Sequence, residues 1–297
     1  MTNTASAING RAYLEEHRQQ VDRLLDRFTP PANEEPKSLH EAMRYSLMAG
    51  GKRIRPILCL AAYEHALAST TKPSEPIQYA MAALEMVHTY SLIHDDLPCM
   101  DDDDLRRGMP TCHKKFGEAI AVLAGDGLHV VAFELMARTG SLQAVLELAE
   151  AVGTFGMLGG QVADLEAEGK TSVTKPEVTN IHKRKTGALI RGSVRIGAIL
   201  ADADPRLLGK LTVYGERVGL AFQIIDDILD IEGDQRLLGK KVGSDSKNQK
   251  ATYPSAVGID QARNDAARLI DEALAVFDGY DDNILKFLAR YIGQREK

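Results

Sequence analysis

The 297-residue sequence lacks the marks of several protein classes. Its three cysteines, Cys59, Cys99 and Cys112, show neither CxxC nor the paired spacing of a disulfide scaffold, so we expect reduced thiols in a cytoplasmic protein. The N-terminal segment has no apolar signal-peptide core, and no uncharged run reaches the roughly 18 residues of a membrane helix. The net charge is −6 and no basic stripe runs along the chain, so the sequence shows no basic surface that would bind nucleic acid. We therefore expect no membrane insertion and no nucleic-acid partner.

Strand signals are also scarce. Alternating runs of Val, Ile and Thr are few, whereas Ala- and Leu-rich segments recur with a period near 3.6. We predict an all-α fold in a single domain over residues 1–297, in which residues 1–38 form an N-terminal helix and loop. Ser38 and Thr174, each followed three residues later by Glu, predict capping boxes. The periodicity predicts helices over residues 11–28, 56–68, 77–95, 116–138, 141–166, 176–201 and 207–231.

The most informative stretch is HTYSLIHDDLPCMDDDDLRRG, residues 88–108. Six aspartates follow an apolar helical run there, and crowded carboxylates repel one another unless a cation neutralises them. Mg²⁺ takes such oxygen ligands and fills its other positions with water and substrate phosphates. Arg106 and Arg107 add forked donors that suit phosphate oxygens. The stretch predicts a metal–diphosphate site, and a solvated acidic loop, the usual fate of a charge run, is the alternative.

A second acidic helix repeats this pattern in GLAFQIIDDILDIEGD. Spacings of three and four residues place Gln223, Asp226 or Asp227, and Asp230 on one helix face. Like charges at that spacing destabilise a helix unless something sits between them. A solvent-facing stripe accounts for one such helix but not readily for two. Two acidic helices that face each other across a cavity could hold several Mg²⁺ ions and a diphosphate.

Basic residues form a third group of candidates. Lys52, Arg53 and Arg55 follow a glycine pair in GGKRIRP. They either complement a helix C-terminus, worth roughly 0.3–1 kcal/mol each, or embrace a second diphosphate, and the residues alone leave these two interpretations even. His88 lies seven residues before Asp95 and hence on nearly the same helix face, although a lone helix histidine is more often structural.

Seven motifs occur in the order GGKRIRP, the first DD motif with its RRG, LAGD, GGQVAD, KRKTGALI, FQIIDD and KATYP. In these motifs the chain resembles the isoprenyl diphosphate synthases, most closely the bacterial farnesyl type, from about residue 39 to the C-terminus. The resemblance implies a single large helical bundle around a central cavity. It also implies three Mg²⁺ ions per site with substrate bound, small-molecule isoprenoid diphosphates as substrates, and a homodimer.

The resemblance also assigns individual residues. It selects Asp101 through the pattern DDxxxxD, where spacing alone leaves Asp101 and Asp102 open because Pro98 distorts the turn. The implied metal ligands are Asp95, Asp96, Asp101, Asp226 and Asp230. The implied substrate-binding residues are Gly51, Lys52, Arg55, His88, Arg106, Arg107, Lys185, Thr186, Gln223, Lys240 and Lys250. The implied catalytic residues are Asp95, Asp101, Asp226, Lys185, Thr186 and Gln223, of which Thr186 and Gln223 direct oxygen dipoles at a carbocation.

The implied reaction is head-to-tail prenyl transfer from an allylic diphosphate, dimethylallyl or geranyl, to isopentenyl diphosphate. We expect farnesyl diphosphate as product because Tyr90, beside Ser91, lies five residues before Asp95, about 7–8 Å down the helix. A bulky ring there closes the pocket, and in the family an aromatic at this position goes with C15 products. The alternatives are a geranylgeranyl or geranyl diphosphate synthase, a class I terpene cyclase, and a non-catalytic subunit. Product length, preferred allylic substrate and oligomeric state stay open at this point.

Overall fold

A computed structural model of the chain describes residues 9–69, 73–170, 172–232 and 250–295. Within these residues the chain is helical apart from one short two-stranded antiparallel ribbon. The N-terminal half contains α1 (Gly10–Phe28), α2 (Lys37–Leu47), α3 (Ile54–Leu67), α4 (Glu75–Asp95), β1 (Leu105–Arg106), β2 (Met109–Pro110), α5 (Cys112–Phe116), α6 (Glu118–Arg138) and α7 (Leu142–Val152). The rest contains α8 (Met157–Ala167), α9 (Lys175–His182), the π-helical turn η1 (Lys183–Gly187), α10 (Ala188–Leu200), α11 (Pro205–Glu232), α14 (Tyr253–Val257), α15 (Ile259–Ala275) and α16 (Ile284–Gly293).

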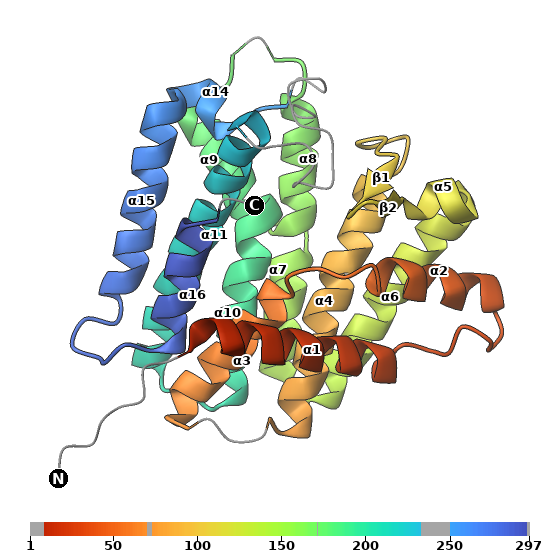
Figure 1. The fold of residues 1–297 in the computed structure, drawn as a ribbon, viewed down its shortest axis with the longest axis horizontal. Helices are drawn as coiled ribbons and strands as arrows, with labels where there is room; N and C mark the ends of the chain where they lie inside the picture. The colour runs from red at the N-terminus through yellow and green to blue at the C-terminus, as the bar shows by residue number, and fades with distance from the viewer. Residues whose placement is uncertain (1–8, 70–72, 171, 233–249, 296–297) are drawn as a thin grey trace.

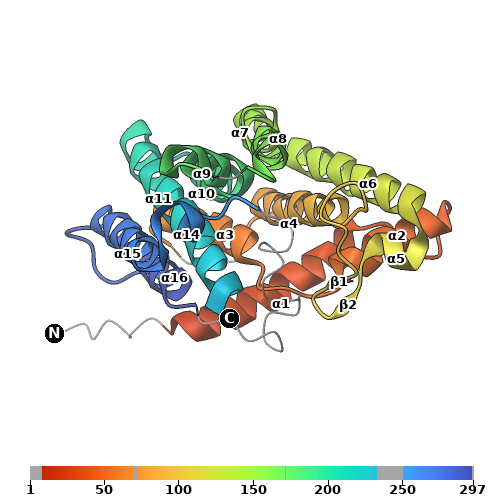
Figure 2. The same cartoon turned by 90° about the horizontal axis from the view of Figure 1, so that it is seen from above.

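The predicted all-α fold is confirmed, and the long helices pack into a bundle (Figure 1). Helix α4 is buried on every face, as expected of a helix whose apolar residues are not confined to one stripe. It packs against α3, α6 and α10, while α1 crosses it from outside. Seen from above, α6, α7 and α8 line one side of the bundle, and α1 lies on the other (Figure 2).

The core consists of two large clusters of buried apolar side chains. One is built mainly from α1, α2, α4 and α6, and the other from α10, α11, α15 and α16. Helices α3 and α10 contribute side chains to both clusters and so tie them together. Because α4 belongs to the first cluster and α11 to the second, the C-terminal ends of these two helices are held on opposite sides of the space between them.

Three local predictions meet different outcomes. The capping box at Thr174 is confirmed, because its hydroxyl accepts from the Glu177 backbone and the Glu177 carboxylate accepts in return. The box predicted at Ser38 is wrong, since α2 begins one residue earlier with Pro36 as its cap. The single helix predicted over 141–166 is also wrong. Gly153 ends α7 with an extended backbone (φ −69°, ψ −169°), as suits a residue with little helix propensity.

Helix α6 is the one helix in the described ranges with the length and apolar composition of a membrane span. It carries Glu118, Asp126, Glu134 and Arg138, so it contains no uncharged run of that length. Only 39% of its most apolar window is buried inside the chain. Core helices of soluble proteins pass the same test.

Candidate active site

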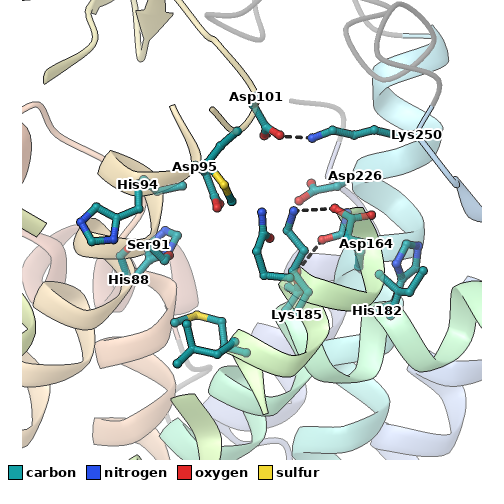
Figure 3. A pocket seen from close by; sticks show the side chains of 18 of the residues that line it. His88, Ser91, His94, Asp95, Asp101, Asp164, His182, Lys185, Asp226 and Lys250 are labelled. Carbon is teal, nitrogen blue, oxygen red and sulfur yellow. Dashed lines mark hydrogen bonds and ion pairs between the residues drawn. The ribbon is translucent and has the colours of Figure 1, made fainter. Parts of the chain in front are cut away.

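A cavity of about 680 Å³ opens between the C-terminal ends of α4 and α11, with α8 and η1 on its lower side (Figure 3). It brings together side chains from both acidic stretches and from the basic motifs. The predicted site residues that line it are Arg55, His88, Tyr90, Ser91, Asp95, Asp101, Arg106, Arg107, Lys185, Thr186, Gln223, Asp226, Asp230 and Lys250. Gly51, Lys52 and Asp96 are not among its lining residues, and Lys240 lies outside the described residues.

The first acidic corner forms where α4 ends. The chain turns at Leu97–Pro98 and returns so that the backbone N–H of Asp101 donates to the carbonyl of Asp95 at 2.8 Å. Both carboxylates therefore face the cavity, whereas Asp102 takes a left-handed backbone (φ 49°) and points to solvent. Burial raises the pKa of Asp95, against the opposing effect of Lys185 and with the support of Asp101. Two crowded carboxylates of this kind favour a bound cation.

Asp96 takes a different position from the one expected of a metal ligand. Its buried carboxylate accepts from Nε of Arg106 at 2.9 Å, and burial raises its pKa to about 6 despite that partner. Asp96 thus holds Arg106, whose own side chain reaches the cavity. This placement does not support Asp96 as a metal ligand, because its neighbour on the chain, Asp95, is the one that faces the opening.

The second acidic corner lies on the last turns of α11. Asp226 faces Asp95 and Asp101 across the cavity (Figure 3) and forms an ion pair with Arg295 of the C-terminal segment. Asp230, one turn further along, also lines the cavity and is buried. The two acidic helices therefore do meet at one hollow, which is the arrangement that the paired sequence motifs predict.

Lysine ammonium groups stand between the carboxylates. Nζ of Lys185 lies 2.7 Å from Oδ2 of Asp164, and Nζ of Lys250 lies 2.9 Å from Oδ2 of Asp101 (Figure 3). Although burial opposes it, Asp95 and Asp164 together raise the pKa of Lys185, so this amine stays charged. Charged amines that face one cavity in this way suit the oxygens of a diphosphate.

Local backbone structure positions Lys185. It lies in the π-helical turn η1, whose wider coil interrupts the helix predicted over 176–201. Gly160 of α8 allows the close approach, since a Cβ on it would lie 2.2 Å from the backbone nitrogen of Lys185. On the other side, a Cβ on Gly219 of α11 would lie 2.9 Å from Cα of Gly187. Short π-helical turns of this kind are frequent at functional sites.

A second basic corner lies beside the first. The guanidinium of Arg107 donates to the Gly50 carbonyl and covers Gly51, where a Cβ would lie 2.8 Å from Cζ of that arginine. Gly51 has φ +135°, a conformation that favours glycine. Arg55 is half-buried, and its buried Nε has no partner among the described residues; burial lowers its pKa to about 10. Unsatisfied buried donors of this kind call for an anion.

His88 completes this corner. Burial lowers its pKa well below 6.5, and Arg55 and Arg107 lower it further. The imidazole is therefore neutral, so that it can donate one hydrogen bond to an anion without adding another cation to the group. Burial lowers the pKa of Lys52 most. Nearby Arg295 lowers it further, and Asp226 opposes the shift.

Arg53, which sequence reasoning grouped with its neighbours, has a structural role. Its buried guanidinium donates to Glu85 at 2.7 Å, to Asp22 at 2.9 Å and to the Leu47 carbonyl at 2.8 Å. It therefore fixes the junction between the loop that carries Lys52 and the start of α3, which carries Arg55, and it is not among the cavity-lining residues. Sequence spacing could not separate the three cations, because their orientation follows from a left-handed backbone at Arg53 (φ 53°).

Tyr90 of α4 lines the cavity and belongs to an aromatic cluster. Tyr90 is almost fully buried and stacks on His129 of α6, with ring centroids 4.6 Å apart. Phe133 backs His129, and His94 meets the other side of Tyr90. Sequence reasoning missed His129, although its spacing of four residues from Phe133 on one apolar helix is a usable signal. It also missed His182, which precedes the KRKT motif and hydrogen-bonds Asp227 at 2.8 Å.

In the described ranges no three His, Cys, Asp or Glu side chains already converge as on a metal ion. The donor set nevertheless suits a hard divalent cation. Carboxylates of Asp95, Asp101 and Asp226 face one hollow from two sides, and a pKa raised by burial marks Asp95 as a group that a cation would stabilise in its charged form. Lys250 and Arg295 supply positive charge there instead.

The fold and this site define an all-α protein with an acid-lined cavity, and comparison with known proteins gives the family. The polyprenyl synthetase family model matches residues 36–291, so the chain belongs to that family. It is 46% identical to farnesyl diphosphate synthase of Escherichia coli (strain K12), over 94% of this chain and 96% of that protein. It is 44% identical to the chloroplastic geranylgeranyl pyrophosphate synthase of Capsicum annuum, over 99% and 80%. An FPP/GFPP synthase from Zymomonas mobilis has a similar structure, with a TM-score of 0.82 at 38% identity, over 97% of this chain and all of that one.

Proposed function

We propose that the protein is a Mg²⁺-dependent prenyltransferase that condenses an allylic diphosphate with isopentenyl diphosphate, head to tail, to give farnesyl diphosphate. The observation that carries the proposal is the pairing of two anion-binding corners in one cavity. One corner has carboxylates for a metal and lysines for a diphosphate. The other has Arg55, Arg107 and His88, and the described part of the chain offers no acceptor to the buried Nε of Arg55. Each corner therefore suits one diphosphate group.

The first corner holds the allylic diphosphate. Asp95, Asp101 and Asp226 would hold Mg²⁺, which draws charge onto the leaving diphosphate, with Asp230 as a further ligand. Lys185, Lys250 and Arg106 contact the same oxygens and stabilise the anion as it departs, which is the strongest contribution that preorganised donors make to catalysis. Lys240 belongs to this group by its match to the family.

The second corner holds isopentenyl diphosphate. Lys52, Arg55 and Arg107 bind its oxygens, neutral His88 donates one hydrogen bond, and Gly51 lets the backbone come close. Its double bond is then presented to the allylic carbon that loses diphosphate. Thr186 and Gln223 line the cavity between the two corners, where their oxygen dipoles stabilise the carbocation.

Tyr90 sets the product length in this proposal. Because the ring of Tyr90 stacks on His129, which Phe133 contacts in turn, it closes the space into which the prenyl tail grows. Ser91 lines the cavity next to it. A floor at this depth stops elongation at C15.

The test is chromatography of the product chain. The purified protein is incubated with Mg²⁺, isopentenyl diphosphate and dimethylallyl diphosphate, and we expect mainly farnesyl diphosphate. Mainly C20 product would instead favour the geranylgeranyl assignment, which the name of the Capsicum relative also allows. Hydrocarbon formed from farnesyl diphosphate alone would indicate a terpene cyclase. No turnover by the wild-type chain would indicate a non-catalytic subunit.

We also propose that the protein acts as a homodimer joined through α6, α7 and α8. These helices form one side of the bundle (Figure 2). Exposed apolar side chains lie on them and on the turn between α7 and α8, including Leu142 at 72% and Phe155 at 86% exposure. A contiguous apolar patch on a protein surface marks an interaction site. A second copy would cover the exposed part of α6 as well.

The dimer proposal is tested by sedimentation. Leu142→Glu combined with Phe155→Glu is expected to give a monomer, whereas Val213→Glu, at an exposed apolar position on α11, leaves the dimer intact. A wild-type protein that sediments as a monomer at micromolar concentration would contradict the proposal.

A further inference from the structure

A continuous chain of hydrogen bonds runs along the cavity wall from η1 to α14. Thr186 Oγ1 lies 2.7 Å from Oε1 of Gln223, and Nε2 of Gln223 lies 2.9 Å from Oδ1 of Asp227. The other oxygen of Asp227 accepts from Nε2 of His182 at 2.8 Å and from the backbone N–H of Tyr253 at 2.7 Å. Asp227, His182 and Thr186 are all buried.

The chemistry of these groups allows one direction of donation. A carboxylate only accepts, so Gln223 must turn its amide NH₂ toward Asp227 and its carbonyl toward Thr186. A carbonyl also only accepts, so the hydroxyl proton of Thr186 must point at Gln223. Every hydrogen in the chain thus points toward Asp227. The free lone pairs of Thr186 and of the Gln223 carbonyl are left for the cavity that both residues line.

We propose that Asp227 and His182 are positioning residues that hold the oxygens of Gln223 and Thr186 toward the reacting carbon, an inference that rests on the proposed function. Asp227 adjoins Asp226 in sequence but has a different role. Its two oxygens already accept three hydrogen bonds within the protein. His182 contributes one of these bonds and so fixes the rotamer of the Asp227 carboxylate.

Loss of the Asp227 acceptor would allow the dipole of the Gln223 amide to reverse. If Asp227 offered a donor, the Gln223 amide could rotate and place its NH₂ against Thr186 and the cavity. Positive hydrogen atoms would then face a developing cation, where electron-rich oxygens are needed. The predicted loss therefore falls on the chemical step and much less on the binding of either diphosphate.

Asp227→Asn is the direct variant, because its side chain keeps the shape and gains a donor. We expect kcat to fall on the order of 10- to 100-fold, the usual effect of losing an orienting partner, with KM values for both substrates changed little. His182→Leu is expected to lower kcat by a similar factor. His182→Gln, which keeps a donor, should recover part of that loss. The matched control is Asp265→Asn, a buried carboxylate that also accepts from three donors but does not line the cavity. It should leave kcat unchanged.

A double-mutant cycle separates positioning from a general loss of structure. If Asp227 acts through Gln223, then Asp227→Asn added to Gln223→Leu should cost little further kcat. Losses that multiply, or an Asp265→Asn variant that loses as much kcat as Asp227→Asn, would overturn the proposal.

A readout that needs neither metal nor substrate completes the test. The side-chain amide protons of Gln223, identified by NMR through their absence in Gln223→Leu, should exchange slowly in the wild-type protein and faster in Asp227→Asn. Equal exchange in the two would overturn the positioning role. A wild-type protein that joins no prenyl units would overturn the proposed function, and the amide exchange would still decide whether Asp227 orients Gln223.

Discussion

Nζ of Lys250 lies 2.9 Å from Oδ2 of Asp101 at the edge of the cavity, although the two residues belong to distant parts of the chain (Figure 3). The contact joins the turn after α4 to the segment before α14. In the proposed function, Asp101 would bind Mg²⁺ and Lys250 would then contact an oxygen of the leaving diphosphate.

Replacing this lysine should weaken catalysis. Lys250→Ala is expected to lower kcat/KM for the allylic diphosphate on the order of 10²-fold, because one preorganised cation is lost from the departing anion. Steady-state kinetics measures the effect. Lys114→Ala is the matched control, since Lys114 pairs with exposed Asp104 at 2.9 Å outside the cavity. Equal losses in the two variants would contradict the assigned role of Lys250.

Shortening Tyr90 should lengthen the product. Tyr90→Ala removes the ring that stacks on His129, so the prenyl tail can extend toward α6 and the main product should shift from C15 to C20 or longer. Product chromatography measures the shift. An unchanged C15 product in a folded variant would show that another group sets the length.

Alanine should have opposite effects at two helix glycines, one at the contact of α8 with η1 and one where the added Cβ meets open space. Gly160→Ala places a Cβ 2.2 Å from the Lys185 backbone and should destabilise the fold by about 1–3 kcal/mol while lowering kcat. Gly209→Ala, in a helix where a Cβ meets nothing within 4 Å, should stabilise it by about 0.5–1 kcal/mol. Chemical denaturation with an activity assay measures both. A harmless Gly160→Ala would show that the contact does not position Lys185.

The low pKa of His88 makes the fold sensitive to acid. In the unfolded chain His88 takes up a proton near pH 6.5, whereas in the folded protein burial and then Arg55 and Arg107 keep it neutral to lower pH. Below about pH 6.5 the unfolded state thus binds more protons, and the free energy of unfolding falls as pH falls, by at most about 1.4 kcal/mol per pH unit for this one group. Above about pH 6.5 His88 is neutral in both states, so this group no longer changes the free energy of unfolding with pH.

Denaturant unfolding at a series of pH values measures the effect. His88→Gln should flatten the fall in stability between pH 6.5 and the acid limit of folding, whereas His40→Gln, at a partly exposed position on α2, should leave it unchanged. The same slope in wild type and His88→Gln would show that His88 is not held neutral.

Helix periodicity and the two acidic motifs were sufficient to predict the all-α fold and the meeting of Asp95 with Asp226. The apolar residues of α4 and α11 bury these helices in the two core clusters, and the acidic motifs near their C-terminal ends come together as a result. Spacing could not choose between Asp101 and Asp102, because Pro98 breaks the helical register. In the turn that follows, the N–H of Asp101 donates to the Asp95 carbonyl and that of Asp102 to the Leu97 carbonyl. The family pattern supplied Asp101, and it is Asp101 that lines the cavity.

Other features depend on contacts between distant residues that no local pattern reveals. The π-helical turn at Lys185 depends on the absence of a side chain at Gly160 in another helix. Asp96 and Arg53 looked like site residues in the sequence, yet each holds a neighbouring charged group in place. Which member of a charged pair faces a ligand follows from backbone geometry and burial, and these are set by the packed fold.

Calorimetric titration of the protein with inorganic diphosphate, with and without Mg²⁺, tests the central claim most directly, because it separates metal-dependent binding from the chemical step. The account predicts binding by the wild-type protein that requires Mg²⁺ and is lost both in Asp95→Asn and in Asp226→Asn, since the carboxylates act from opposite sides of one cavity. Undiminished Mg²⁺-dependent binding in either variant would contradict it.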